Sequence, residues 1–474
     1  MSSREVFQLR PLGWEQDPEE ERFKLSTLDP TPQCAYNHYV LFFRLEDAKK
    51  SEAVEVVKTG LQRTLSQARY MCGTIEHDPE GGLSFVKRKD SAVQFVVHRL
   101  DPKGEHPSLD AIEKAHFSGH SLQDVNLWSI PELTWGERPE AIPDRSPAVS
   151  AYQLNLLEGG LILSMHHHHY SCDVMGWSNF TRQLAENCHA IFNATAFPSW
   201  DPACIDASRF TKTLPAESLV DGPPVPAKHP GHREQQPVLF HLPKRKAEAL
   251  KKLATPTDPE AHWISTYDAV CAYIWRMLSK VRAPLHNPDP SATLWWGEAV
   301  NMRPRLSKPP VPERMMRNVV AGAFSDTAPV PALTVADVVS DAPLSKLAGY
   351  IRALTESCNE QHLGLLIDLI APIRDKRTIS LRVDAHPPMS MFVTDHRPAD
   401  VSAFDFGFAK PITHRHVWGD LVTAGVVLIY PPVGSAAAAA DEGCTFAITM
   451  EKELVPKLVE DAEWTEYFEY RGID

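Results

Sequence analysis

The chain has 474 residues, a formal net charge of −13 and a hydrophobic fraction of 43%. This length exceeds what one hydrophobic core usually serves, so it predicts two domains. The excess of 61 acidic over 48 basic side chains argues against nucleic acid or an anionic membrane as the main partner.

The start of the chain shows no export signal. Residues Met1–Glu5 are not followed by the apolar core of a signal peptide, and no run approaches the roughly 20 apolar residues that span a bilayer. We therefore expect a cytoplasmic protein with no membrane partner. The 8 cysteines lack paired metal-ligand spacing and are interpreted as reduced and mostly buried.

The first half is predicted to alternate strands with helices. An apolar strand at 36–45 precedes a helix that begins near Ser51, where apolar residues recur at steps of three and four. Residues 72–87, with proline and glycine at their centre, are typical of a hairpin. The proline-rich residues 101–148 are predicted to be mainly loop.

A second hairpin leads into the candidate site. Strands at 148–157 and 161–165 are followed by the four histidines His166–His169, and helical spacing returns over residues 180–191. Successive side chains of a strand point to opposite faces. At least two of these histidines are therefore expected to pack or to form structural hydrogen bonds.

His169 and Asp173 form an H-x-x-x-D spacing in this stretch. The spacing suits an imidazole that faces a cleft, as a candidate base, with a structural carboxylate behind it. Three other interpretations are open: a structural His/Asp pair, a thiol nucleophile at Cys172, and a metal site. No H-E-x-x-H helix or paired C-x-x-C is present to complete a metal sphere, so we expect no metal.

Residues 215–237 are rich in proline and are predicted to be a crossover between two domains, 1–214 and 238–474. The second domain is predicted to contain both strands and helices. Its expected elements are a strand at 238–242, a helix to 252, a helix opened by Ser265–Asp268, a strand at 293–296, a helical pattern over 335–358 broken by Pro343, strands at 421–430 and 444–450, a loop or short helix at 435–440, and a helix from Glu451.

Two polar features of this half bear on the site. Ser265 is a candidate N-cap, which leaves backbone N–H groups for a phosphate or carbonyl, although such a cap more often only stabilises its helix. Arg303 is a candidate to clamp Asp173 through two parallel hydrogen bonds.

Four motifs occur in order along almost the whole chain. Residues His168–Asp173 are similar to H-H-x-x-x-D-G, and Asp405–Pro411 are similar to D-F-G-W-G-K-P. Ser265–Ala269 are similar to an S-T-x-D-A helix start, and Asn301–Leu306 to an arginine motif. Together they resemble the CoA-dependent acyltransferases called BAHD, and within them the fungal trichothecene O-acetyltransferase-like branch.

The resemblance implies a chloramphenicol-acetyltransferase-like α/β fold, with two similar domains and a solvent channel between them. Carried over by position, it makes His169 the general base in the middle of the channel. It makes Asp173 structural and ion-paired with Arg303, and it gives the Asp405 loop the role of remote structural support.

The resemblance also implies acyl-CoA as co-substrate, with acetyl-CoA as the expected donor, and a small-molecule acceptor that enters from the opposite face. Ser265, Thr266 and Lys410 are candidates for the CoA side. A monomer is expected.

The chain departs from the family pattern at two positions. Val174 replaces the glycine after Asp173, so that glycine's role is expected to shift to Gly176 or the turn to differ. Phe408 replaces a tryptophan and removes an indole N–H from a possible oxyanion or pocket position. Thr394 or a backbone amide is the candidate substitute donor.

These observations favour O-acetylation of a hydroxyl on a fungal-type secondary metabolite. A hydroxyl is almost fully protonated at neutral pH, so its attack on a thioester needs a base, and imidazole titrates in the suitable range. One alternative is a repurposed enzyme that uses His169 for condensation, cyclisation or elimination without CoA. The other is a small-molecule binding protein without turnover.

Overall fold

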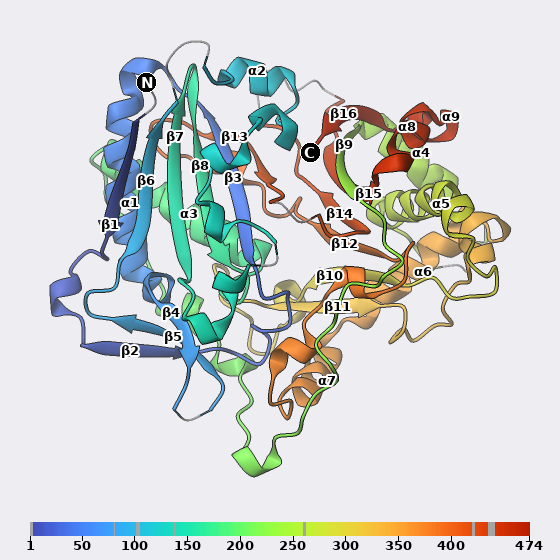
Figure 1. The fold of residues 1–474 in the computed structure, drawn as a ribbon, viewed down its shortest axis with the longest axis horizontal. Coiled ribbons are helices and arrows are strands. Elements are labelled where there is room, and N and C mark those ends of the chain that lie inside the picture. Colours follow the sequence, from blue (N-terminus) through green and yellow to red (C-terminus); the bar gives the residue numbers. More distant parts are fainter. Residues whose placement is uncertain are drawn as a thin grey trace.

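The computed structural model describes residues 3–79, 81–100, 105–136, 138–258, 262–419, 422–434 and 441–474. The described residues form two lobes, each built on a large sheet (Figure 1). The first lobe contains β1 (Ser3–Leu9), β2 (Glu20–Lys24), β3 (Tyr36–Arg44), α1 (Lys50–Gln67), β4 (Thr74–His77), β5 (Leu83–Arg88), β6 (Val93–Arg99), α2 (Leu109–Lys114), β7 (Ser150–Leu157), β8 (Gly160–His168) and α3 (Val174–Phe192).

The second half of the chain supplies the remaining elements. They are β9 (Gln235–Leu242), α4 (Lys244–Ala254), α5 (Thr266–His286), β10 (Trp296–Asn301), β11 (Val320–Phe324), α6 (Leu344–Ser357), α7 (Glu360–Ile370), β12 (Met391–Asp395), β13 (Pro411–His416), β14 (Val426–Ile429), β15 (Cys444–Glu451), α8 (Val455–Glu460), α9 (Ala462–Tyr467) and β16 (Glu469–Ile473).

Both large sheets mix parallel and antiparallel pairs. Among the described residues the first has the order β1-β6-β7-β8-β3-β13 and the second β11-β10-β12-β14-β15-β9-β16, while β2, β5 and β4 form a small third sheet. The strand pairs β6/β7, β10/β12 and β12/β14 are parallel. The predicted α/β class is confirmed.

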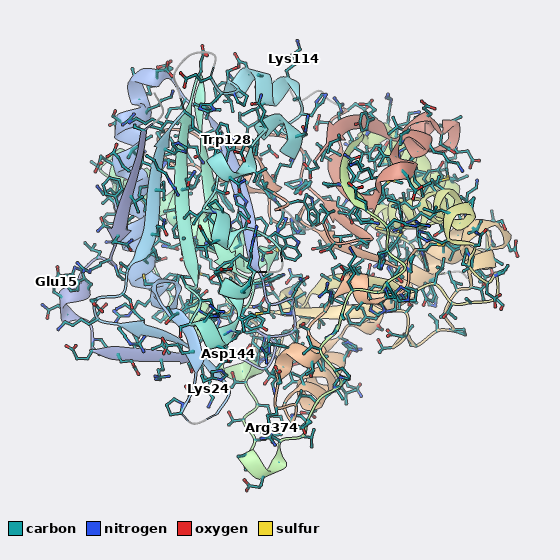
Figure 2. The ribbon with its side chains drawn as sticks, in the orientation of Figure 1. Glu15, Lys24, Lys114, Trp128, Asp144 and Arg374 are labelled. Atoms are coloured by element: carbon teal, nitrogen blue, oxygen red, sulfur yellow. The ribbon has the colours of Figure 1, made fainter. Side chains whose placement is uncertain are left out.

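The first sheet is covered on both faces. Helices α1 and α3 pack on one face, where Leu61 and Leu184 join Leu41 and Leu163 of the strands in one apolar cluster. The segment over residues 105–136 and 138–148 covers the other face, and Trp128 of that segment lies over the strands in Figure 2. This segment contains α2 and several short helical turns, where the sequence predicted mainly loop.

The second sheet has helices α4, α5 and α6 on one face. Its other face carries a smaller cluster of Leu239, Leu428 and Tyr430 with Trp418, and Trp135 of the first lobe packs against it. The two lobes therefore meet across this face of the second sheet.

The domain division at 215–237 does not separate the two sheets completely. β13 belongs to the second half of the chain, yet it pairs antiparallel with β3 and forms an edge of the first sheet (Figure 1, orange strand among blue and green strands). β9 also begins within the expected crossover, at Gln235. The chain thus crosses between lobes again after β12, which the local sequence pattern did not reveal.

Several predicted elements are confirmed and others need correction. The strands at 36–45, 148–157 and 444–450 are present within two residues of β3, β7 and β15, and β9 begins three residues before the strand expected at 238–242. The strand expected at 293–296 starts instead at Trp296, because Trp295 leaves the ladder and stacks on His386 with ring centroids 3.9 Å apart. The helix from Glu451 is divided into short pieces, and α7 and β16 were not predicted.

Some predictions fall partly or wholly on residues outside the described ranges. The loop or short helix at 435–440 lies entirely outside them. Residue 80 of the hairpin turn, residues 101–104 and 137 of the proline-rich segment, and Leu421 of the strand predicted at 421–430 also lie outside. The described part of that strand is β14.

Candidate active site

Three of the four consecutive histidines have structural roles. His166 and His168 point to the same face of β8, where their rings bond to the carbonyl oxygens of Leu133 and Ala141 at 2.8 and 2.9 Å. Burial lowers the pKa of His166 and of His168 to about 4, so both rings are neutral near pH 7. The expectation that at least two of these histidines are structural is confirmed.

His167 points to the opposite face, toward α3. Its Nε2 lies 3.2 Å from the Tyr152 hydroxyl, and its Nδ1 lies 3.5 Å from Cys172 Sγ. Burial raises the pKa of the Cys172 thiol to about 12 and lowers the pKa of His167 to about 3. The pair therefore stays uncharged, which argues against the alternative of a thiol nucleophile.

His169 follows the end of β8 and has a different environment. Its backbone N–H donates to the Ala35 carbonyl at 2.8 Å, which fixes the backbone beside β3. The ring is partly exposed: Nδ1 is buried without a hydrogen-bond partner, whereas Nε2 retains accessible surface and also has no partner among the described residues. Burial lowers the pKa of His169, and its own carbonyl and the Asp173 charge act in the opposite direction. A neutral imidazole with an open nitrogen is the form that a general base requires.

Asp173 is held by both halves of the chain. As the N-cap of α3, its Oδ1 accepts the Gly176 N–H at 2.7 Å, and its Oδ2 accepts the Val319 N–H at 2.9 Å. Arg303 contacts both oxygens, with Nη1 2.9 Å from Oδ2 and Nη2 3.0 Å from Oδ1. The arginine clamp expected from the sequence is present, and Asp173 is directed away from open space.

A segment just after the arginine motif also fixes the histidine loop. The Asn318 amide donates to the carbonyls of His169 and Tyr170 at 3.2 and 3.0 Å and to Asp29 Oδ1 at 3.1 Å. Arg317 pairs with the other oxygen of Asp29. Sequence reasoning missed these residues, because contacts between positions almost 300 residues apart leave no local pattern.

Gly176 is where the two halves of the chain approach each other closely. A Cβ at this position would lie 2.2 Å from the Met316 carbonyl oxygen and 2.9 Å from the Cys172 Cβ. Val174 is the first residue of α3, and its side chain packs against the apolar cluster of the first lobe. The suggested shift of the glycine role to Gly176 agrees with this geometry.

Thr394 lies on the face of the second sheet that meets the first lobe. On β12 the side chain of Val393 points to the apolar core beneath the helices of the second lobe, so the side chain of Thr394 points to the other face. Phe392 lies on that same face and packs against the cluster of Leu239, Leu428 and Tyr430. The Thr394 hydroxyl has no hydrogen-bond partner among the described residues and is not fully buried. Thr394 is therefore available as a donor on the side opposite β8.

A group of rings near His169 was not foreseen from the sequence. The Trp135 ring centroid lies 6.4 Å from that of His169 and 5.2 Å from that of His416. His416 lies 5.4 Å from Tyr39, which stacks on Trp177 at 4.2 Å. The alternating His-Arg-His of residues 414–416 was the only available signal, and it becomes informative only once β13 is paired with β3.

The candidates for the CoA side occupy two separate places. Ser265 caps α5: its hydroxyl accepts the Asp268 N–H at 3.2 Å, and its own N–H donates to Asp268 Oδ2 at 2.6 Å. Arg352 holds the same carboxylate at 2.6 Å. The Ser265 hydroxyl is thus engaged in the cap, whereas the Thr266 hydroxyl has no partner among the described residues and is not fully buried.

The Asp405 loop lies at the other end of α3 from Asp173. Asp405 Oδ1 accepts the Gly407 N–H at 2.8 Å and lies 3.6 Å from His189 Nδ1 near the end of that helix. Gly407 has φ +86°, and a Cβ there would lie 2.7 Å from the Phe192 Cβ. The loop therefore supports α3 at a distance from His169, as the remote role implied.

Phe408 and Lys410 are not brought to His169. Phe408 packs on Phe43 at 5.7 Å between ring centroids, and Lys410 is exposed directly before β13. Phe43 pairs with Pro411 and Tyr36 pairs with His168, so the two sites are separated by seven residues of β3, or about 23 Å. Phe408 therefore acts as a core residue, and a benzyl ring offers no donor for an oxyanion.

A surface cavity of about 620 Å³ lies beside the Asp405 loop. It is lined by Glu186, His189 and Phe404 among others, and it includes neither His169 nor Thr394. Within the described ranges no cluster of three or more His, Cys, Asp or Glu side chains has an arrangement suited to a metal ion. Among the same residues no helix combines the length and apolar character needed to cross a bilayer.

The two-lobed α/β fold, with His169 between the lobes and Asp173 clamped behind it, defines the protein as an acyltransferase of the BAHD type. A family model described as Transferase family matches residues 15–465. The chain belongs to this family.

Three known proteins show the extent of the likeness. Acetyltransferase FGR3 of Gibberella zeae is 52% identical over 478 residues, covering 100% of this chain and 95% of that protein. Trichothecene 3-O-acetyltransferase TRI101 of Fusarium sporotrichioides is 25% identical, covering 88% of this chain and 90% of that protein. The crystal structure of F. graminearum TRI101 complexed with Coenzyme A and T-2 mycotoxin has a TM-score of 0.78 at 23% identity, covering 95% and 100% of the two chains.

Proposed function

We propose that this protein transfers an acetyl group from acetyl-CoA to a hydroxyl of a small secondary metabolite, with His169 as the general base. The observation that carries the proposal is the open, unpartnered Nε2 of His169 next to an Asp173 whose oxygens are already occupied. The named activities of the relatives support the same reaction and do not favour a CoA-independent enzyme or a binding protein.

The reaction needs one proton to move twice. The acceptor O–H donates its proton to His169 Nε2 as the oxygen attacks the thioester carbonyl carbon. The tetrahedral intermediate then collapses, the C–S bond breaks, and the imidazolium returns the proton to the departing CoA sulfur. The products are an acetyl ester and free CoA thiol, and no acyl-enzyme is formed.

The oxyanion of the intermediate requires a hydrogen-bond donor. The Thr394 hydroxyl is our candidate, because it is unpartnered, not fully buried and on the sheet face opposite β8. One such donor contributes about 3 kcal/mol to transition-state stabilisation in comparable sites. Removal of the hydroxyl in Thr394→Val should therefore lower kcat by about 10²-fold with little change in KM.

For the donor side, Thr266 is a stronger candidate than Ser265. The Ser265 hydroxyl already caps α5, while the Thr266 hydroxyl and the first N–H groups of the 21-residue helix are our candidates to bind a phosphate or carbonyl of CoA. Lys410, about 23 Å along β3 from the histidine loop, is a candidate only for the distant end of a long co-substrate.

The test is an assay of thiol release from acetyl-CoA with a panel of alcohols. His169→Ala should lower kcat/KM by about 10³-fold, in the usual range for a lost general base. His77→Ala is a matched control, because His77 is exposed on β4 and pairs with the exposed Asp144. Thermal unfolding should change little in His169→Ala, since no side chain among the described residues forms a hydrogen bond with its ring. Equal rates in wild type and His169→Ala would contradict the proposal.

Two properties of the whole protein accompany this proposal. A monomer is proposed because one chain supplies both His169 and the residues that clamp its loop, including Arg303 and Asn318. A cytoplasmic location is proposed because reduced cysteines and an acidic surface suit that compartment. Light scattering of the purified protein would test the monomer, and fractionation of cells of the native host would test the cytoplasmic location.

A further inference from the structure

Three side chains around His169 carry polar atoms that have no hydrogen-bond partner in the part of the chain that the structure describes. Tyr39, His396 and His416 are only 2%, 3% and 5% exposed. In both histidines Nδ1 is fully buried and unpartnered. Their Nε2 atoms and the Tyr39 hydroxyl also have no hydrogen-bond partner among the described residues, but these three atoms are not fully buried. Each residue thus presents one open polar atom from an otherwise enclosed ring.

The three residues come from both lobes and gather on the His169 side of the interface. Tyr39 is on β3, His416 on the neighbouring β13, and His396 directly follows β12 of the second sheet. The Tyr39 ring centroid lies 5.4 Å from His416 and 6.1 Å from His396. Trp135 connects the group to His169, with centroid distances of 5.2 Å to His416 and 6.4 Å to His169.

All three groups are uncharged near neutral pH. Burial lowers the pKa of His396 to about 4 and of His416 to about 3, and it raises the pKa of Tyr39 well above its usual range. The neighbouring Asp395 carboxylate is engaged by Arg397 at 2.7 Å. The open atoms therefore offer neutral donors and acceptors and no countercharge for an ion.

We propose that Tyr39, His396 and His416 bind the acyl acceptor, and that this acceptor is a neutral molecule with at least one oxygen besides the hydroxyl that reacts. This inference rests on the proposed role of His169. Three unpartnered polar atoms that keep some accessible surface, on rings that are otherwise enclosed, can form hydrogen bonds to one ligand beside them. A hydroxyl or carbonyl oxygen next to the reacting hydroxyl supplies the complementary group.

The experiment uses three probes with the same ring skeleton and the full-length protein. 2-Naphthol has no second oxygen, 2,3-dihydroxynaphthalene has one, and 3-hydroxy-2-naphthoate has a second oxygen group that is charged. Binding is measured by calorimetry without CoA, so it does not depend on turnover. The diol should bind about tenfold more tightly than 2-naphthol, as expected for one added hydrogen bond, and the anion should bind most weakly.

Variants identify the atoms responsible. His416→Phe, His396→Phe and Tyr39→Phe each remove the open polar atom while keeping a ring, and each should reduce the preference for the diol by about threefold or more. None breaks a hydrogen bond within the protein, so thermal stability should be kept or raised. His414→Phe is the matched control on the same strand: both its ring nitrogens are fully buried, so the preference should not change.

The outcomes separate this inference from the proposed function. Equal affinity for the diol and 2-naphthol, no binding of any probe, or a preference that persists in all three variants would overturn the inference. If the diol preference is present and depends on these residues but no alcohol ever releases thiol from acetyl-CoA, the proposed function fails and the binding site remains. Thiol release from acetyl-CoA without any preference for the diol would overturn this inference and leave the proposed function standing.

Discussion

Arg303 holds Asp173 through two parallel hydrogen bonds, 2.9 and 3.0 Å long, between residues 130 positions apart in the chain. Both side chains are only 9% exposed. Two backbone N–H groups complete the coordination of the carboxylate, one from the first turn of α3 and one from Val319. The carboxylate therefore joins the second half of the chain to the loop that carries His169, and it positions the histidine without facing a substrate.

Asp173→Asn should destabilise the protein as well as inactivate it. The amide would leave the Arg303 guanidinium buried without its countercharge, which typically costs about 3–5 kcal/mol. Urea unfolding of the purified variant measures this loss. The double variant Asp173→Asn with Arg303→Gln should lose less than the single variant, because it contains no uncompensated charge. A fully stable but inactive Asp173→Asn would instead indicate a direct role in the chemistry.

Gly176→Ala should disturb the same junction for a steric reason. The new Cβ would lie 2.2 Å from the Met316 carbonyl oxygen, so α3 or the facing segment must move, and we expect a loss of about 2–3 kcal/mol. Gly349→Ala in α6 is the control, because a Cβ there meets nothing within 4 Å and should stabilise the helix by about 0.5–1 kcal/mol. Equal unfolding midpoints for the two variants would show that the close approach is not required.

Stability should fall steeply between pH 6.5 and pH 4. Burial lowers the pKa of His166, His168 and His396 from 6.5 to about 4. Below pH 6.5 the unfolded chain therefore binds protons that the folded protein excludes. The stability these groups provide is complete above pH 6.5 and is lost as pH falls toward 4, by about 1.4 kcal/mol per pH unit for each proton.

The measurement is urea unfolding at several pH values in this window. His396→Phe should reduce the slope of unfolding free energy against pH by about one proton, because one titrating group is removed from the unfolded state. An unaltered slope in His396→Phe would mean that this ring titrates in the folded protein.

Glu298 should make the free energy of unfolding change with pH in the opposite direction. Burial raises the pKa of Glu298 to about 7, although Tyr267 and Thr355 donate hydrogen bonds to it. The folded state therefore binds this proton more tightly than the unfolded chain, so its contribution is complete below pH 4.5 and is lost as pH rises through 7. Relative to wild type, Glu298→Gln should gain about 3 kcal/mol of stability between pH 4 and pH 8, since each unit of the difference between 4.5 and about 7 is worth about 1.4 kcal/mol. A difference that does not vary with pH would contradict this account.

Local sequence predicted the elements that carry a continuous apolar run or a simple apolar period. The strand at 36–45 was identified from a short run of aromatic and branched apolar residues, and the helix near Ser51 from apolar residues at steps of three and four. The structure has β3 and α1 at these places. α7 was missed because its apolar residues run around the helix, with Leu365 and Leu369 62% and 70% exposed. β16 is stabilised mainly by its pairing with β9, which is distant in sequence.

The sequence likewise predicted some residues of the candidate site and missed others. The H-x-x-x-D spacing and the arginine motif were readable because each is a short run of polar residues at the end of an apolar strand. Tyr39 was read only as a strand residue, and His416 was not singled out. Tyr39 and His416 come together only because β13 pairs with β3, and this pairing cannot be read from either segment alone.

The sequence by itself determined the α/β class, the family, and the histidine and aspartate around which the site is built, because these depend on local periodicity and on motifs whose order survives in the chain. Only the tertiary structure decided that β13 returns to the first sheet, that Gly176 must be small, and which polar atoms remain open beside His169. Those properties arise from contacts between segments tens to hundreds of residues apart. The free energy of such a contact depends on both segments together, so it cannot be inferred from the local sequence of one.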